Sequence, residues 1–232
     1  GGFGTWLALI FKTAFSLLGM GAYLSIFWPD ISLITVGVVL AMGFGLMNLI
    51  GTKKVGAIQV FFVVFLILIL FIFISLGFPE IQYNRFEGFF DKGTMSIFST
   101  AGLVFISYVG VTNIASVAEE IKDPERNLPI CVFLAITTAI VIYVLGTMIM
   151  VGVLPADELA QNLTPVASTA EALFGEWVKA WITIAAIISF ASVANAGILS
   201  ASRYPLAMSR DHLIPRRFSQ ITARGIPLFG VV

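Results

Sequence analysis

Hydrogen-bonding side chains gather around Gly110, in a stretch whose flanks are strongly apolar. Within ten residues the chain carries Ser107, Tyr108, Thr112, Asn113 and Ser116. A lipid-facing helix has no use for such side chains at the middle of a membrane. A helix broken over a small ligand does need them, because the break leaves backbone groups without partners. The stretch therefore predicts a membrane helix interrupted near Gly110, with a binding site at the interruption.

Gly110 itself suits a break, since a residue without a Cβ leaves helical geometry at little steric cost. The valines on either side of it are poor helix formers. A second half-helix starting near Thr112 would direct its free N–H groups at a carboxylate, and the carbonyls of residues 105–108 suit an ammonium group. A zwitterionic ligand carries both groups. The alternative is that Gly110 only lets a neighbouring helix approach closely.

The composition places these residues in a membrane protein. Hydrophobic residues make up 59% of the 232 residues and charged residues 11%, against about 25% charged in soluble domains. At about 20 residues per span, the chain has room for roughly six spanning helices. The net charge of zero gives no sign of a nucleic-acid partner, and one cysteine and one histidine leave little for metal, haem or triad chemistry. We expect no metal, no cofactor and no enzymatic activity.

The hydropathy pattern predicts an all-α polytopic fold in a single transmembrane domain, an internal piece of a longer protein. Leu154–Gly175 is too polar to span, and we expect it to form an interfacial lid with short helical pieces. The expected spans are residues 3–27, 31–50, 55–77, 95–120 (the broken one), 130–153 and 177–208, with the start of another at 226.

The placement of lysine and arginine predicts the orientation. If the spans alternate, nine of the thirteen basic residues fall on one side and three on the other, with Lys12 inside a span. Because cytoplasmic loops carry the excess of basic residues, loops 51–54, 121–129 and 209–225 are predicted to be cytoplasmic. We expect a multi-pass protein of the plasma membrane.

Two further charged features are candidates for function. Lys12 is an ionisable group within a span, which is a functional candidate by default; the alternative is that its ammonium snorkels to the cytoplasmic surface. Glu119 and Glu120 end the broken span and, with Arg203, are candidates for a cytoplasmic gate whose ion pairs break on opening. The alternative for them is a solvated helix end.

Three runs together resemble the amino acid–polyamine–organocation (APC) transporter superfamily. SYVGVTNIASVAEEIKDPERNLP, from Ser107, is similar to the family's sixth span and following loop. ASVANAGILSASRYPLAMSRDHLIP, from Ala191, is similar to the eighth span and its exit, and NLIGTKKVGAIQ, from Asn48, to the loop between spans four and five. The resemblance implies a fold of two inverted five-helix repeats. This chain would hold spans three to eight and the start of the ninth.

The resemblance also implies the parts of a substrate site. The carboxylate of an amino acid would be bound mostly by the family's first span, which this chain lacks. Tyr108 or Phe105 is the expected aromatic cover, and Thr112, where relatives with cationic substrates often carry an acid, favours a neutral amino acid. The expected substrate-binding residues are Phe105, Ile106, Ser107, Tyr108, Gly110, Thr112 and Asn113.

The resemblance leaves the coupling ion open. Some relatives place a lysine on the fifth span as a substitute for sodium, but the matching position here, about Leu66, is apolar. Ser189, Ser192 and Asn195 lie where sodium-coupled members have ligands, and the alternative for them is hydrogen bonding between helices. We expect secondary transport of an amino acid across the lipid bilayer by alternating access, coupled to H+, to Na+ or to exchange. The alternative function is a receptor-like protein that binds an amino acid without moving it.

Overall fold

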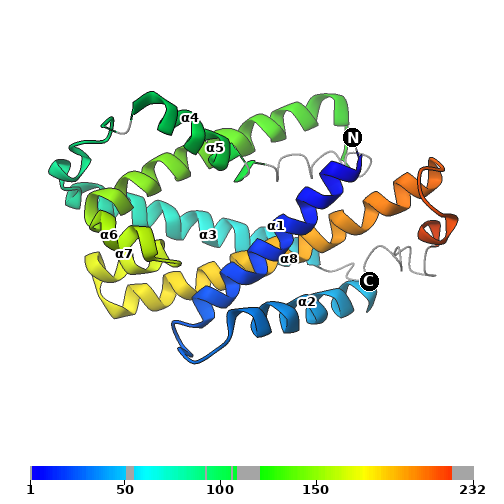
Figure 1. Ribbon diagram of the computed structural model, residues 1–232, viewed down its shortest axis with the longest axis horizontal. Coiled ribbons are helices and arrows are strands. Elements are labelled where there is room, and N and C mark those ends of the chain that lie inside the picture. Colours follow the sequence, from blue (N-terminus) through cyan, green and yellow to red (C-terminus); the bar gives the residue numbers. More distant parts are fainter. Residues whose placement is uncertain (1, 51–54, 92, 106, 109–120, 221–232) are drawn as a thin grey trace. The chain divides into compact units, whose positions relative to one another are not determined.

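The computed structural model describes residues 2–50, 55–91, 93–105, 107–108 and 121–220. Within these ranges the chain is helical and has no strand (Figure 1), which confirms the predicted all-α class. Among the described helices, four are long and apolar enough to cross a membrane, as expected of a multi-pass protein. The helices are α1 (Gly2–Leu24), α2 (Leu33–Ile50), α3 (Val55–Gly77), α4 (Gly93–Phe105), α5 (Pro124–Val153), α6 (Ala156–Gln161), α7 (Pro165–Phe174) and α8 (Glu176–Arg210), with the 3-10 turns η1 (Phe78–Glu80), η2 (Tyr83–Phe86) and η4 (Arg216–Ser219).

The chain divides into two compact units. The first joins Gly1–Ile67 to Trp181–Val232, and the second is Leu68–Ala180. Segments far apart in sequence therefore pack within the first unit, whereas the second unit is continuous in the chain. The units are described separately below.

In the first unit, α1 and α2 form a hairpin. The helix α1 ends at Leu24, three residues before the predicted end at residue 27, because the chain turns there. The Ser25 N–H still donates to the Gly21 carbonyl at 2.9 Å, and the Trp28 N–H donates to the Leu24 carbonyl at 3.1 Å. The next helix begins at Leu33, two residues later than predicted.

The helices α1 and α8 pack closely in the same unit (Figure 1). The Ser16 hydroxyl donates to the Phe190 carbonyl at 3.0 Å, and the ring of Phe190 covers Gly19, where a Cβ would lie only 2.7 Å from it. Gly197 on α8 faces Thr13 on α1 with similarly little space. Small residues of this kind let membrane helices approach closely.

In the second unit, α5 is the element against which the others pack. A Cβ at Gly77, the end of α3, would lie 2.7 Å from Ile149 on α5 and 3.3 Å from Leu173 on α7. The Gln82 N–H donates to the carbonyl of Gly152 at 3.0 Å. The far end of α5 is therefore tied to the loop that follows α3 and to α7.

The helix α5 begins at Pro124, six residues before the predicted start of the span at residue 130. Asp123 adopts a left-handed conformation (φ 46°) just before it, and proline is well suited to the first helical position, where its missing N–H would be unpaired anyway. The Asn127 side-chain amide donates to the Lys122 carbonyl at 2.6 Å. Pro129, which we took as a boundary in the sequence, lies inside the helix.

Candidate functional site

In the sequence, the predicted substrate site falls at the end of α4 and in the segment that leads to α5. The helix α4 ends at Phe105, and Ser107 and Tyr108 follow as the last described residues before residue 121. The remaining predicted substrate-binding residues, and with them the break itself, lie outside the described residues: Ile106, Gly110, Thr112 and Asn113.

Tyr108 is half-buried, and its ring meets that of Tyr143 on α5. The ring centroids are 5.6 Å apart at an interplanar angle of 64°, an edge-to-face arrangement that aromatic pairs prefer. We did not single out Tyr143 from the sequence. Its signal was a phenol in the middle of an otherwise apolar span, since a hydroxyl placed in a membrane usually has a partner.

A hollow of about 320 Å³ opens beside this pair, which is within the size range of small-ligand pockets. Among the described residues, its polar side chains are the two tyrosines and Thr147, each with a hydroxyl, and none of those that line it is charged. Such a lining accepts an apolar group and offers a few hydrogen bonds. The lining residues are Phe86, Phe89, Val104, Tyr108, Tyr143, Val144, Thr147, Met148 and Val151.

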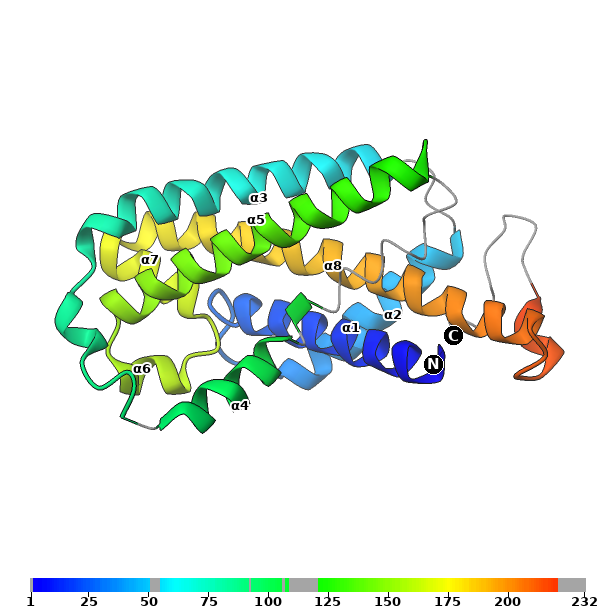
Figure 2. The same cartoon turned by 90° about the horizontal axis from the view of Figure 1, so that it is seen from above.

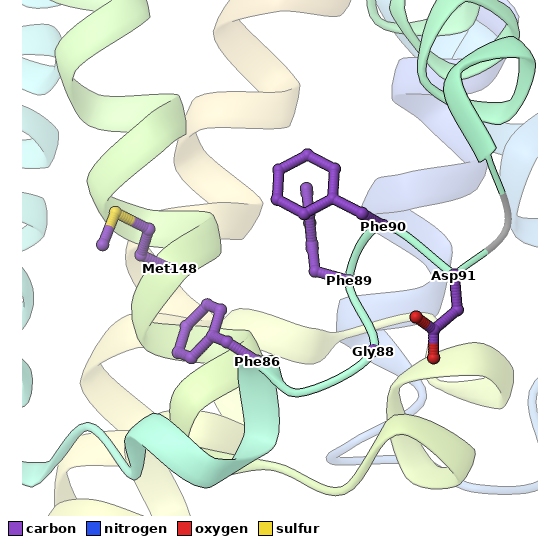
Figure 3. A pocket seen from close by; sticks show the side chains of 6 residues that line it. All are labelled: Phe86, Gly88, Phe89, Phe90, Asp91 and Met148. Atoms are coloured by element: carbon purple, nitrogen blue, oxygen red, sulfur yellow. The ribbon is translucent and has the colours of Figure 1, made fainter.

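A second hollow of about 480 Å³ adjoins the first, because both are lined by Phe86, Phe89 and Met148. Figure 3 shows the side chain of Phe86 beside that of Met148 on α5. The side chains of Phe89 and Phe90 extend from the loop between η2 and α4. The rings of Phe89 and Phe90 lie 5.0 Å apart, edge to face. The loop that precedes α4 thus adds an aromatic rim to the hollow beside Tyr108.

The two predicted aromatic covers have different surroundings. Tyr108 lines the first hollow. Phe105 is 70% exposed, and neither it nor the exposed Ser107 lines a hollow described above. Within the described part of the site, Tyr108 is therefore the better placed of the two.

Lys12 lies half-buried on α1, ten residues from its start at Gly2, or about 15 Å along the helix axis. No carboxylate of the described residues forms an ion pair with it.

Ser189, Ser192 and Asn195 lie three residues apart on α8 and are half-buried. Asn195 accepts a hydrogen bond of 2.8 Å from the side-chain amide of Asn48 on α2, which also donates to the Phe44 carbonyl at 2.8 Å. Hydrogen bonding between helices was the alternative that we gave for these residues, beside a role as sodium ligands. Asn48 is only 4% exposed. From the sequence we gave it no role of its own, because it appeared only as the first residue of the run NLIGTKKVGAIQ.

Of the residues predicted to form a cytoplasmic gate, the structure describes only the arginine. Arg203 is half-buried on α8, whereas Glu119 and Glu120 lie outside the described residues. The described residues contain no group of three or more histidine, cysteine or acidic side chains that could hold a metal ion.

The predicted interfacial lid contains α6 and α7. Between them, Asn162 organises the turn: its side-chain carbonyl accepts from the Thr164 N–H at 2.8 Å, and its amide donates to the Ser168 hydroxyl at 2.8 Å. Ala167 and Ala170 on α7 are completely buried. Glu171 forms an ion pair of 2.8 Å with Lys179 at the start of α8.

The Glu171–Lys179 ion pair predicts a pH-dependent contribution to stability. The hydrogen bond from Lys179 lowers the pKa of Glu171, so the contribution is complete above the carboxyl's ordinary pKa of 4.5 and disappears as the pH falls through the lowered value. In the full-length protein, Glu171→Gln should lower the free energy of unfolding by about 0.2–1 kcal/mol at neutral pH, and by less in acid. Thermal unfolding at the two pH values measures this, with the exposed Glu158→Gln as the control. An equal loss at both values would contradict the prediction.

Comparison with known proteins gives a consistent picture. A family model described as amino acid permease matches residues 2–232. The branched-chain amino acid permease BcaP of Bacillus subtilis is 28% identical over 79% of this chain and 39% of its own length. Cationic amino acid transporter 2, a vacuolar protein of Arabidopsis thaliana, is 32% identical over 61% of this chain and 22% of its own. The probable threonine/serine transporter YbxG of Bacillus subtilis is 26% identical over 98% of this chain and 52% of its own. The chain thus spans about half or less of the length of these relatives.

Proposed function

The chain belongs to the amino acid permease family, and on that premise we propose that the protein carries a neutral amino acid across a membrane by secondary transport. Family membership confirms the resemblance to APC transporters and the expectation that the protein is not an enzyme. The substrate, the mechanism and the coupling are the parts proposed here.

The observation that carries the substrate proposal is the hollow beside Tyr108 and Tyr143. The described residues that line it offer hydroxyls but no charged side chain, and Asp91 lines only the adjoining hollow. A buried cationic side chain without a carboxylate partner would be strongly disfavoured. Thr112, in the predicted break, supports the same choice because it is neutral. Relatives are named for branched-chain, cationic and threonine/serine substrates, so family membership by itself does not choose the substrate class.

The proposed mechanism is alternating access around the predicted break. The amino group of the substrate and part of its carboxylate bind the freed backbone groups of residues 107–113, the family's first span binds the rest of the carboxylate, and the substrate side chain enters the hollow beside Tyr108. Lys12 and the α8 set of Ser189, Ser192 and Asn195 are the proposed places to look for coupling to H+ or Na+. Loops 121–129 and 209–225 lie in the cytoplasm, and the protein resides in the plasma membrane.

Uptake by the full-length protein in proteoliposomes tests this proposal. We expect accumulation of a radiolabelled neutral amino acid, competition by other neutral amino acids and weak competition by lysine. Gly110→Leu should reduce uptake at least tenfold, since a Cβ and a longer side chain oppose the break. The control is Gly146→Ala on α5, where an added Cβ meets open space.

Imposed gradients of H+ and Na+ in the same vesicles identify the coupling ion. Saturable binding without uptake would overturn the transport proposal and favour the receptor-like alternative. Equal competition by lysine and leucine would overturn the choice of a neutral substrate.

A further inference from the structure

The turn that follows α8, residues 209–219, has a defined shape. The Leu213 N–H donates to the Met208 carbonyl at 2.9 Å, and the hydroxyl of Ser209 donates to the Pro215 carbonyl at 2.9 Å. Ser209 is buried, and His212 reverses the chain in a left-handed conformation (φ 59°). This turn is drawn in orange to red at the end of α8 in Figure 2.

The turn presents a large apolar side chain surrounded by arginines. Leu213 is 72% exposed, although the hydrogen bonds around it fix its position. Arg210, Arg216 and Arg217 on either side of it are also exposed. An exposed leucine among cations is the arrangement of a membrane-surface segment, in which the apolar group enters the acyl boundary and the cations meet headgroups.

The charge of this turn differs from that of another predicted cytoplasmic loop. Residues 209–219 carry three arginines and one aspartate, a net charge of +2. Residues 121–129 carry two basic and two acidic residues, which cancel. A general excess of basic residues on the cytoplasmic side accounts for the sign of the charge but not for the exposed Leu213.

Neighbouring aromatic residues place the end of α8 at the level of the membrane surface. A Cβ at Gly2, the start of α1, would lie 3.5 Å from the sulfur of Met208, so the two helix ends are adjacent. Phe3, which is 60% exposed, and Trp6 form an edge-to-face pair at this end of α1. Aromatic side chains at the end of a spanning helix favour the headgroup region.

We propose that residues 209–219 dock on the anionic lipid headgroups of the cytoplasmic leaflet, with Leu213 inserted at the acyl boundary and Arg210, Arg216 and Arg217 on the headgroups. The side of the membrane rests on the orientation given under the proposed function. This contact would hold the cytoplasmic end of α8 at the membrane surface and make it sensitive to lipid composition.

A fluorescent probe at the tip tests the docking. The full-length protein, with Cys131→Ser and any other cysteine replaced, receives an NBD label at Leu213→Cys. It is placed in nanodiscs of phosphatidylcholine alone or mixed with phosphatidylglycerol. We expect a blue-shifted emission, and quenching by a lipid-borne quencher, in the anionic nanodiscs, both weakened by salt. Each of Arg210→Gln, Arg216→Gln and Arg217→Gln should weaken the response to phosphatidylglycerol by about fivefold.

Arg85→Gln, which removes one arginine from the loop predicted to lie on the other side of the membrane, is the matched control and should leave the probe signal unchanged. A signal that is the same in neutral and anionic nanodiscs would overturn the proposal. The readout requires no transport. An unresponsive probe in an active transporter therefore contradicts only the docking, and a responsive probe in an inactive protein contradicts only the proposed function.

Discussion

Gly197→Ala is expected to lower the free energy of unfolding of the full-length protein by about 1–3 kcal/mol, the range for overpacking a tight interface. The added Cβ would overlap the Thr13 hydroxyl and lie 3.3 Å from its Cβ and 3.5 Å from its Cγ2. Rotation of Thr13 would break the hydrogen bond of its hydroxyl to the Leu9 carbonyl (2.8 Å) and would leave its Cβ 3.3 Å from the added Cβ. We therefore expect the substitution to push α1 and α8 apart. Thermal unfolding in detergent measures the loss.

A compensating substitution gives this prediction its sharpest test. Thr13→Ala removes the hydroxyl and the methyl group that meet the new Cβ, so the double variant Thr13→Ala/Gly197→Ala should recover most of the lost stability. The control is Gly43→Ala on α2, where nothing lies within 4 Å of the added Cβ; it should be neutral or slightly stabilising, since alanine is a better helix former than glycine. Additive losses in the double variant would mean that Thr13 and Gly197 are not in contact.

Tyr143→Ala is expected to reduce kcat/KM for uptake about tenfold while the protein stays folded. The edge-to-face pair with Tyr108 is worth about 0.5–1.5 kcal/mol beyond the area it buries, and its loss frees the Tyr108 ring and enlarges the hollow. A tenfold change corresponds to about 1.4 kcal/mol. Tyr143→Phe keeps the ring contact and should retain most of the activity, apart from any part carried by the hydroxyl.

Uptake and thermal unfolding should be measured together for these variants. Tyr83→Ala, at an exposed tyrosine of η2 (75% exposed), is the control and should transport normally. Normal uptake by Tyr143→Ala would show that this pair does not shape the substrate path. A collapse of thermal stability in Tyr143→Ala would instead assign the pair to packing.

Several features of the fold followed from the sequence because they depend on local composition. Apolar runs of membrane length predicted the α-helical class and the approximate places of α1, α3 and α8, since a backbone in lipid must satisfy its hydrogen bonds internally. The helix α5 extends beyond the predicted span at its start, where the sequence has Pro129 before the apolar run. Proline is tolerated near the beginning of a helix, and Pro124 had already begun this one.

Which side chains meet was decided by the tertiary structure. The sequence predicted Tyr108 as a site residue but did not predict its contact with Tyr143, 35 positions later, because the contact depends on how α5 packs beside the end of α4. In the same way, the sequence proposed Asn195 as a ligand candidate but did not predict that Asn48 on α2 would donate a hydrogen bond of 2.8 Å to it. Hydropathy is a property of each segment by itself. Helix–helix contacts depend on small differences in packing between whole faces. For that reason the sequence determined the helical class and predicted the spans and the region of the site, while only the packed structure selected the residues that touch.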